Sequence, residues 1–186
     1  IYTLSLHDAL PILKISDVTV YKVKPRWIFV KISTDEGIEG WGEMISGTKT
    51  ETVVAGAYEI GNRLIGRNPF EIERLFQEMH RSFFRGGPIN GTIVSGLEMA
   101  LWDIKGKAFN VPVYELLGGA ARDKIKVYSW IGGDRPSEVA EQAQDRFDRG
   151  FTAVKMNATE ELHYIDSYQK VDEVVERVAS IRERFG

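Results

Sequence analysis

Residues able to do acid–base or metal chemistry are few in this chain and lie far apart. There is no cysteine, which excludes disulfides and thiolate metal sites. Neither His80 nor His163 has a partner at metal-ligand spacing, so both are interpreted as structural or surface residues. The Gly-rich run Arg85–Pro88 lacks the Gly-Lys-Ser/Thr ending of a phosphate-binding loop. Asp103 and Lys105 lie in a helical pattern and are interpreted as packing or ion-pair residues.

Four other side chains have the chemistry to bind a small anionic or hydroxylated ligand. Arg26 and Lys155 can bind a carboxylate, and Trp27 can shield a site from water. Asn157 can donate to and accept from a sugar hydroxyl, but an amide does not titrate near working pH and cannot act as a base. Each residue also has a structural interpretation. Arg26 is then a surface cation, Trp27 a core aromatic, Lys155 a structural residue at the end of a strand, and Asn157 a turn or helix-capping asparagine.

The composition limits the classes of partner. A net charge of -3 argues against nucleic acid, because phosphate binding needs clustered Lys and Arg. No window approaches the roughly 20 apolar residues of a membrane span. The lack of cysteine fits a reducing cytoplasm. A length of 186 residues suffices for one domain plus part of another.

The elements that position these residues change in type along the chain. Residues 14–23, 27–33 and 38–44 are rich in β-formers, and a tight turn at Thr34–Gly37 joins the last two. They predict a three-stranded antiparallel meander. Apolar stripes at helical spacing follow in residues 53–64, 72–79 and 93–104, and a short helix is predicted at 113–117. Asn68 and Pro69 indicate a helix start, with Glu71 closing a capping box.

The pattern from residue 125 onward is strand, helix, strand, helix. Strands are expected at 125–129 and 151–156, and helices at 139–147 and 171–181. This alternation indicates a parallel α/β sheet. Two such units cannot bury both faces of a sheet, so this part is expected to be unfinished.

Residues 1–12 differ from the rest. They match the translation of a common short-read sequencing adapter, and they lack the basic start and long apolar core of a signal peptide. We interpret them as a library artefact, with Leu13 at or near the true start; the alternative is a natural N-terminal extension.

The segment Ser95–Gly118 resembles the signature of the mandelate racemase and muconate-lactonizing enzyme group of the enolase superfamily. Its small residues Gly96, Ala100 and Gly106 suit close helix packing. Within that group, several stretches are similar to the D-galactonate dehydratases, among them 25–32, 40–43, 84–89, 122–126, 128–136 and 155–157. The resemblance runs from Leu13 to Gly186.

The resemblance implies an α+β fold in two parts. An enolase-type N-terminal capping domain, a meander plus helices, is expected at 13–124. The first two βα units of a truncated TIM-type barrel are expected at 125–186. It also implies a Mg²⁺-dependent sugar-acid dehydratase that removes an α-proton and expels a β-hydroxyl, with symmetric assemblies of four or eight chains. Mg²⁺ ligands, catalytic histidines and the His-Asp base are expected beyond Gly186.

The resemblance also places the four ligand-binding candidates. Arg26 and Trp27 fall where the group's first specificity loop closes over the site. Lys155 and Asn157 end the second barrel strand, and racemases of the group carry a lysine base where Asn157 stands. A racemase or cycloisomerase is therefore disfavoured. Dehydratases of gluconate, mannonate or galactarate, and an inactive capping-domain fragment, remain alternatives.

Overall fold

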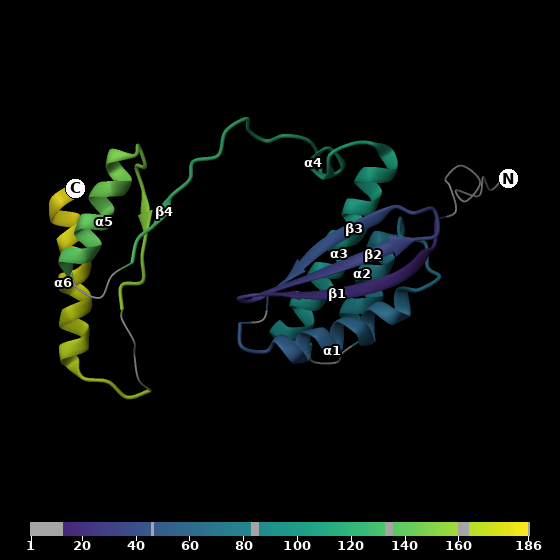
Figure 1. Cartoon of the computed structure of the whole chain (residues 1–186), viewed down its shortest axis with the longest axis horizontal. Helices are drawn as coiled ribbons and strands as arrows, with labels where there is room; N and C mark the ends of the chain where they lie inside the picture. The colour runs from purple at the N-terminus through teal and green to yellow at the C-terminus, as the bar shows by residue number, and fades with distance from the viewer. Residues whose placement is uncertain (1–12, 46, 83–85, 133–135, 160–163, 186) are drawn as a thin grey trace. The chain divides into compact units, whose positions relative to one another are not determined.

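The chain divides into two compact units, one ending at Ala121 and the other beginning at Arg122. The structure is a computed structural model, and it describes residues 13–45, 47–82, 86–132, 136–159 and 164–185. The segment 1–12 and His163 lie outside the described residues. Each unit is described here by itself (Figure 1).

The first unit is built on the predicted meander. Strands β1 (Ile15–Val23), β2 (Trp27–Thr34) and β3 (Glu39–Met44) form an antiparallel sheet in the order β1-β2-β3. The turn between β2 and β3 places Gly37 at a φ of 80°, and the Thr34 N–H donates to the Ile38 carbonyl at 3.0 Å. A positive φ is accessible to glycine at little cost, so the predicted turn forms.

Helices cover one face of this sheet (Figure 1). They are α1 (Thr50–Gly61), the 3-10 turn η2 (Asn62–Leu64), α2 (Ile72–Arg81), α3 (Gly87–Phe109) and the short α4 (Val113–Leu116). Helices α1 and α3 pack on the strands, and α2 packs on α3. Alternate strand residues point into the core, where they meet the apolar stripes of the helices; fully buried members include Ile28, Val30, Ile32, Val53, Leu75, Leu97 and Leu101.

Helix α3 and strand β3 approach closely enough to touch through their backbones. A Cβ atom placed on Gly42 would lie 1.9 Å from the carbonyl oxygen of Gly96, and one on Gly40 would lie 2.0 Å from that of Ala100. A side chain at either strand position would overlap the helix. The small residues of the Ser95–Gly118 signature therefore let the long helix lie directly on the sheet.

Side chains from the helices also form hydrogen bonds with individual backbone groups of both edge strands. On β1, the Val20 N–H donates to the Tyr58 hydroxyl at 3.2 Å. On β3, the Trp41 N–H donates to Asp103 Oδ2 at 2.9 Å. Lys107 Nζ donates to the same carboxylate at 2.8 Å and to the Glu39 carbonyl at 2.7 Å. The interpretation of Asp103 as an ion-pair residue is confirmed, and these contacts protect the sheet edges from pairing with another strand.

The prediction for the start of α2 was wrong. The helix begins at Ile72, with Glu71 as its N-cap residue and no side-chain capping hydrogen bond. Asn68 instead accepts from the Phe70 N–H at 2.9 Å in a local turn that precedes the helix. The Glu71 carboxylate contacts Arg74 at 3.2 Å and does not close a capping box. An asparagine side chain accepts from a downstream backbone N–H as readily in a turn as at a helix cap. The Asn68-Pro69 pair therefore marks a turn here and not the helix start.

An arginine pair surrounds one carboxylate of α2. Glu78 accepts two hydrogen bonds from Arg67, at 2.7 and 3.0 Å, and one from Arg74 at 3.1 Å. These guanidinium groups lower the pKa of Glu78 to about 2.

The second unit contains two βα pairs. Strand β4 (Ser129–Trp130) is followed by α5 (Pro136–Asp148), and β5 (Val154–Lys155) is followed by α6 (Tyr168–Phe185). The strands pair in parallel, as predicted, with Trp130 opposite Lys155. The strand prediction for 125–129 was wrong except at Ser129, since β4 begins there and residues 125–128 are not in a strand. Strand β5 lies within the predicted range 151–156 but is shorter, because β4 and β5 pair with each other only along this short stretch. Residues 122–128 are exposed.

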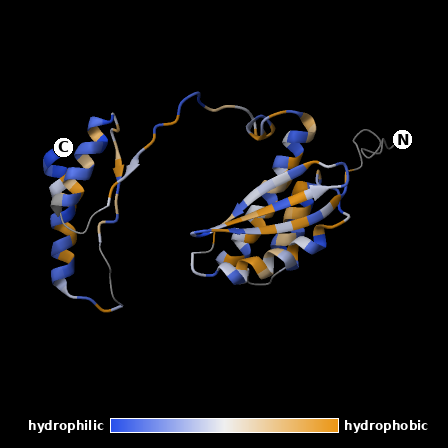
Figure 2. Cartoon of the chain, viewed as in Figure 1, coloured by the Kyte–Doolittle hydropathy of each residue, from blue (hydrophilic) through white to orange (hydrophobic). Residues whose placement is uncertain are grey.

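The core of the second unit is small and lies between its strands and helices. Ile131, Val139 and Ala143 are fully buried, and partly buried neighbours pack around them: Phe147, Val154, Met156, Ile181 and Phe185. Other apolar positions remain open to solvent, including Val171 at 57% and Val175 at 60% on α6. Figure 2 shows such hydrophobic positions interspersed among hydrophilic ones along α6. No helix among the described residues is long and apolar enough to cross a membrane.

Candidate substrate-binding site

Lys155 lies at the carboxyl end of β5, where it meets an aromatic residue of the neighbouring strand. Its Nζ is 4.2 Å from the centroid of the Trp130 ring. Parallel pairing places these residues side by side: the Ser129 N–H donates to Ala153 O at 3.1 Å and the Ile131 N–H to Lys155 O at 3.0 Å. Both side chains are exposed within the unit. A cation within about 6 Å of an indole face is attracted by the ring quadrupole.

The alternation of side chains along the strands determines which face of the sheet each of them occupies. Ile131, Val154 and Met156 belong to the core cluster beneath α5 and α6. Successive side chains on a strand point to opposite faces, so Trp130 and Lys155 lie on the face away from the helices. In a TIM-type barrel this is the inner face, and its carboxyl end holds the active site.

Asn157 follows β5 two residues after Lys155 and is exposed. Continuing the alternation puts it on the same face as Lys155. Among the residues that the structure describes, no hydrogen bond of its side-chain amide is formed. A cation and an amide on one face form a set suited to a hydroxylated carboxylate.

Arg26 and Trp27 lie in the first unit, at the hairpin between β1 and β2. The Arg26 guanidinium carbon is 5.6 Å from the Trp27 ring centroid. Trp27 opens β2 opposite Val23 and is 38% exposed, so it is not part of the buried core. The two form a cationic, aromatic hairpin tip. They belong to a different unit from Lys155 and Asn157, and each pair is described within its own unit.

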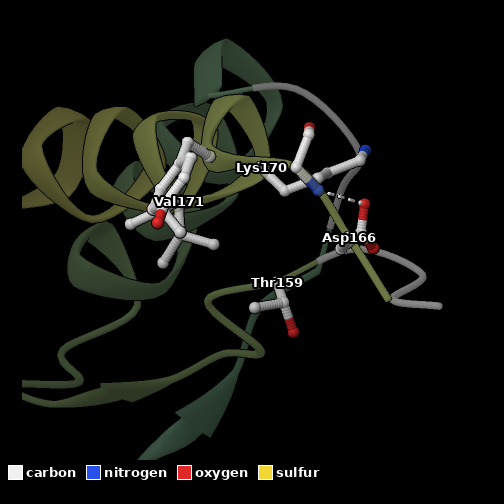
Figure 3. Close-up of a pocket in the computed structure, with 7 residues that line it drawn as sticks. Thr159, Asp166, Lys170 and Val171 are labelled. Carbon is white, nitrogen blue, oxygen red and sulfur yellow. Dashed lines mark hydrogen bonds between the residues drawn. The ribbon is translucent and has the colours of Figure 1, made fainter. Parts of the chain in front are cut away.

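A pocket of about 480 Å³ opens between the chain after β5 and the start of α6 (Figure 3). Its wall is formed by Thr159 and by Asp166, Ser167, Tyr168, Lys170, Val171 and Val174. The Ser167 N–H donates to Asp166 Oδ1 at 3.2 Å (Figure 3). Sequence reasoning did not single out this pocket. An Asp-Ser pair before an apolar stripe signals a helix start, and nothing in it signals a concavity.

The remaining candidates are structural in the described part of the chain. His80 stacks on Phe76 with ring centroids 5.5 Å apart, in the last turn of α2. Lys105 Nζ lies 5.3 Å from the Trp102 ring centroid. Among the described residues, no group of three or more His, Cys, Asp or Glu residues is placed to hold a metal ion.

Comparison with known families agrees with this architecture. The sequence model of the family described as "Mandelate racemase / muconate lactonizing enzyme, N-terminal domain" matches residues 2–118. The chain belongs to this family. The matched span begins inside the segment 1–12, and the adapter interpretation of that segment stays a prediction.

Relatives within the mandelate racemase and muconate lactonizing enzyme family include sugar-acid dehydratases. The chain is 51% identical over 175 residues to D-galactonate dehydratase of Pectobacterium atrosepticum, covering 94% of this chain and 46% of that protein. The D-galactonate dehydratase of Klebsiella pneumoniae is also 51% identical to the chain, and that match also covers 94% of this chain and 46% of that protein. The chain thus spans about half the length of these curated relatives.

Solved structures of the enolase superfamily share the fold. A member of the superfamily from Salmonella Typhimurium has a TM-score of 0.84 at 31% identity, covering 94% of this chain and 52% of that one. An enolase from Pantoea ananatis with bound D-gluconate and Mg has a TM-score of 0.73 at 33% identity, covering 80% of this chain and 39% of that one.

Proposed function

We propose that this chain is the N-terminal part of an acid-sugar dehydratase, a hydro-lyase that converts D-galactonate to 2-dehydro-3-deoxy-D-galactonate. The observation that carries the proposal is the 51% identity to D-galactonate dehydratases, which extends over 94% of this chain. It therefore covers the capping unit and the two βα pairs alike. The Lys155–Asn157 face supports it, because its chemistry suits a hydroxylated carboxylate.

The proposed reaction eliminates one molecule of water from the sugar acid. A base removes the proton α to the carboxylate, and the electron pair forms an enediolate. The C–O bond at the β-carbon then breaks, and the hydroxyl leaves with a proton as water. The resulting enol ketonises to the 2-keto-3-deoxy acid.

In this proposal the residues of the chain bind and orient the substrate. Lys155 lies beside the carboxylate, where negative charge grows in the enediolate, and a fixed cation there stabilises the transition state more than the ground state. Asn157 holds a hydroxyl and takes no proton. The resemblance assigns Arg26 a role in binding a carboxylate or hydroxyls and Trp27 a role in excluding water, and both roles stay predictions for the hairpin tip of the first unit.

The described residues do not provide a Mg²⁺ site, since they contain no metal-binding cluster. Mg²⁺ dependence is nevertheless part of the proposal, because the Pantoea ananatis enolase is solved with D-gluconate and Mg bound. We assign no Mg²⁺ ligand to residues 1–186 and expect the ligands elsewhere in the whole enzyme.

The proposed activity is tested with the whole enzyme, which is obtained from the source DNA. The reading frame that contains this chain is recovered in full, expressed and incubated with D-galactonate, gluconate, mannonate or galactarate. Keto-acid formation is followed with and without Mg²⁺. We expect the highest kcat/KM with D-galactonate, and loss of activity on chelation. Turnover of none of the four acids would reject the proposal, and faster turnover of another acid would correct the substrate.

A matched control is the 186-residue chain by itself. We expect no keto acid from it, because it spans only 46% of the D-galactonate dehydratase that it matches. Exchange of the α-proton by the whole enzyme in deuterated water, without any keto acid, would indicate a racemase instead.

A further inference from the structure

Trp130 belongs to the stretch 128–136 that resembles the D-galactonate dehydratases, but the sequence assigned it no role. Its ring faces the Lys155 ammonium at 4.2 Å, and the two residues are paired across the parallel strands β4 and β5. It is 47% exposed in its unit, while the next residue, Ile131, is fully buried in the core. Trp130 therefore does not act as a core-packing residue within the second unit.

We propose that Trp130 is a positioning residue that holds the Lys155 ammonium over its ring, so that this ammonium faces the carboxylate of the substrate. This inference rests on the proposed function, and it assigns the carboxylate-binding end of the site. Trp130 acts through Lys155 and takes no part in bond making.

In the described part of the chain, the Lys155 ammonium is held by an uncharged aromatic ring and not by a carboxylate. Lysine has a flexible four-carbon stem, so an unheld ammonium samples many positions. A glutamate or aspartate would hold it but would also cancel its charge toward an anionic ligand. An indole face attracts the ammonium and carries no net charge. Among the residues that the structure describes, Lys155 has no salt-bridge partner.

The backbone that carries the indole is tied to helix α5. A Cβ atom on Gly132 would lie 3.4 Å from Trp130 Nε1, an ordinary van der Waals distance, so the glycine lies beside the ring edge. The Gly132 N–H donates to Gln142 Oε1 at 3.0 Å, which ties this turn to α5. Arg146 Nε on the same helix lies 3.5 Å from the Trp130 carbonyl oxygen. Helix α5 thus orients the strand end that carries the ring.

The direct test uses the 186-residue chain and nuclear magnetic resonance. Lysines are converted to ¹³C-dimethyl-lysine, which keeps the positive charge, and the Lys155 signal is assigned from its absence in Lys155→Arg. Ring current should move this signal upfield of the solvent-exposed lysines. Trp130→Leu should return it to their position, and Trp130→Phe should keep an intermediate upfield shift.

The chain offers its own matched control. Lys105 lies over Trp102 at 5.3 Å in the first unit, and its upfield signal should be unchanged in every Trp130 variant. Unaltered helical circular dichroism and unaltered Phe147 and Phe185 ring signals would show that the second unit still folds in Trp130→Leu. A Lys155 signal that stays at its wild-type position in folded Trp130→Leu would overturn the proposal.

A second measurement tests the link to substrate in the whole enzyme. Trp130→Leu should lower kcat/KM about tenfold, mainly through KM, and Trp130→Phe should restore most of it. Unchanged kinetics despite the lost ring-current shift would overturn the role in binding. A whole enzyme without dehydratase activity would reject the proposed function, and the resonance result would still decide whether Trp130 positions Lys155.

Discussion

Gly42→Ala tests the backbone contact between strand β3 and helix α3. The added Cβ would lie 1.9 Å from the Gly96 carbonyl oxygen and 2.8 Å from its carbon. Real Cβ contacts are essentially never shorter than 3.0 Å, so strand and helix must separate by about 1.1 Å. The third near atom is the Ala100 nitrogen at 3.2 Å, so all three are backbone and no flexible side chain can yield.

The helix cannot shift without disturbing the core. Gly96 packs against Met44, because a Cβ atom placed at position 96 would lie 2.4 Å from Met44 Cγ. Helix α3 also buries a full apolar stripe, which includes Leu97 and Leu101. Overpacking a core costs roughly 1–3 kcal/mol, and we expect the upper end, about 3 kcal/mol. At roughly 2–4 °C per kcal/mol for a chain of this size, Tm should fall by about 6–12 °C.

The assay is thermal unfolding of the 186-residue chain followed by circular dichroism, with Gly91→Ala as matched control. Gly91 lies in α3 with nothing within 4 Å of its added Cβ, so the same substitution there should stabilise by roughly 0.5–1 kcal/mol. A Tm for Gly42→Ala within about 2 °C of the wild-type value would refute the reasoning. A similar loss in Gly91→Ala would show that the measurement does not report the contact.

Three further predictions concern charge, substrate and the N-terminal segment. The pKa of Glu78 is lowered from 4.5 to about 2 by Arg67 and Arg74, so its contribution to stability is complete above about pH 4.5 and is lost as the pH falls toward 2. Glu78→Gln should flatten Tm between pH 5 and 2, and an unchanged profile would contradict the ion pairing. In the whole enzyme, Asn157→Ala should lower kcat/KM by roughly one to two orders of magnitude with metal affinity unchanged, because it removes one or two hydrogen bonds. Complete loss of α-proton exchange in that variant, with the fold intact, would mean that Asn157's strand takes part in proton transfer. Deleting residues 1–12 should leave Tm unchanged, whereas a loss of several degrees, about 1 kcal/mol or more, would show that the segment packs.

Local sequence determined much of the first unit. Alternating apolar residues, with a turn at Thr34–Gly37, were sufficient to predict the meander, since a strand with one buried face must repeat every two residues. Apolar stripes predicted α1 and α3 for the corresponding reason at helical spacing. Asn68 shows the limit of local reading, because the same side chain can cap a helix or close a turn.

For the candidate site, the sequence identified single residues and the fold supplied their relations. Spacing alone predicts Lys155 and Asn157 on one face of an extended segment, whereas β5 ends at Lys155 and Asn157 follows it. Trp130 lies 25 positions earlier, and only the register of two parallel strands places its ring against the ammonium. The contact of Gly42 with Gly96 likewise joins residues far apart in the chain. Periodicity encodes which face of an element is buried, whereas the neighbour across a strand or helix is decided by packing, a property of the folded chain as a whole.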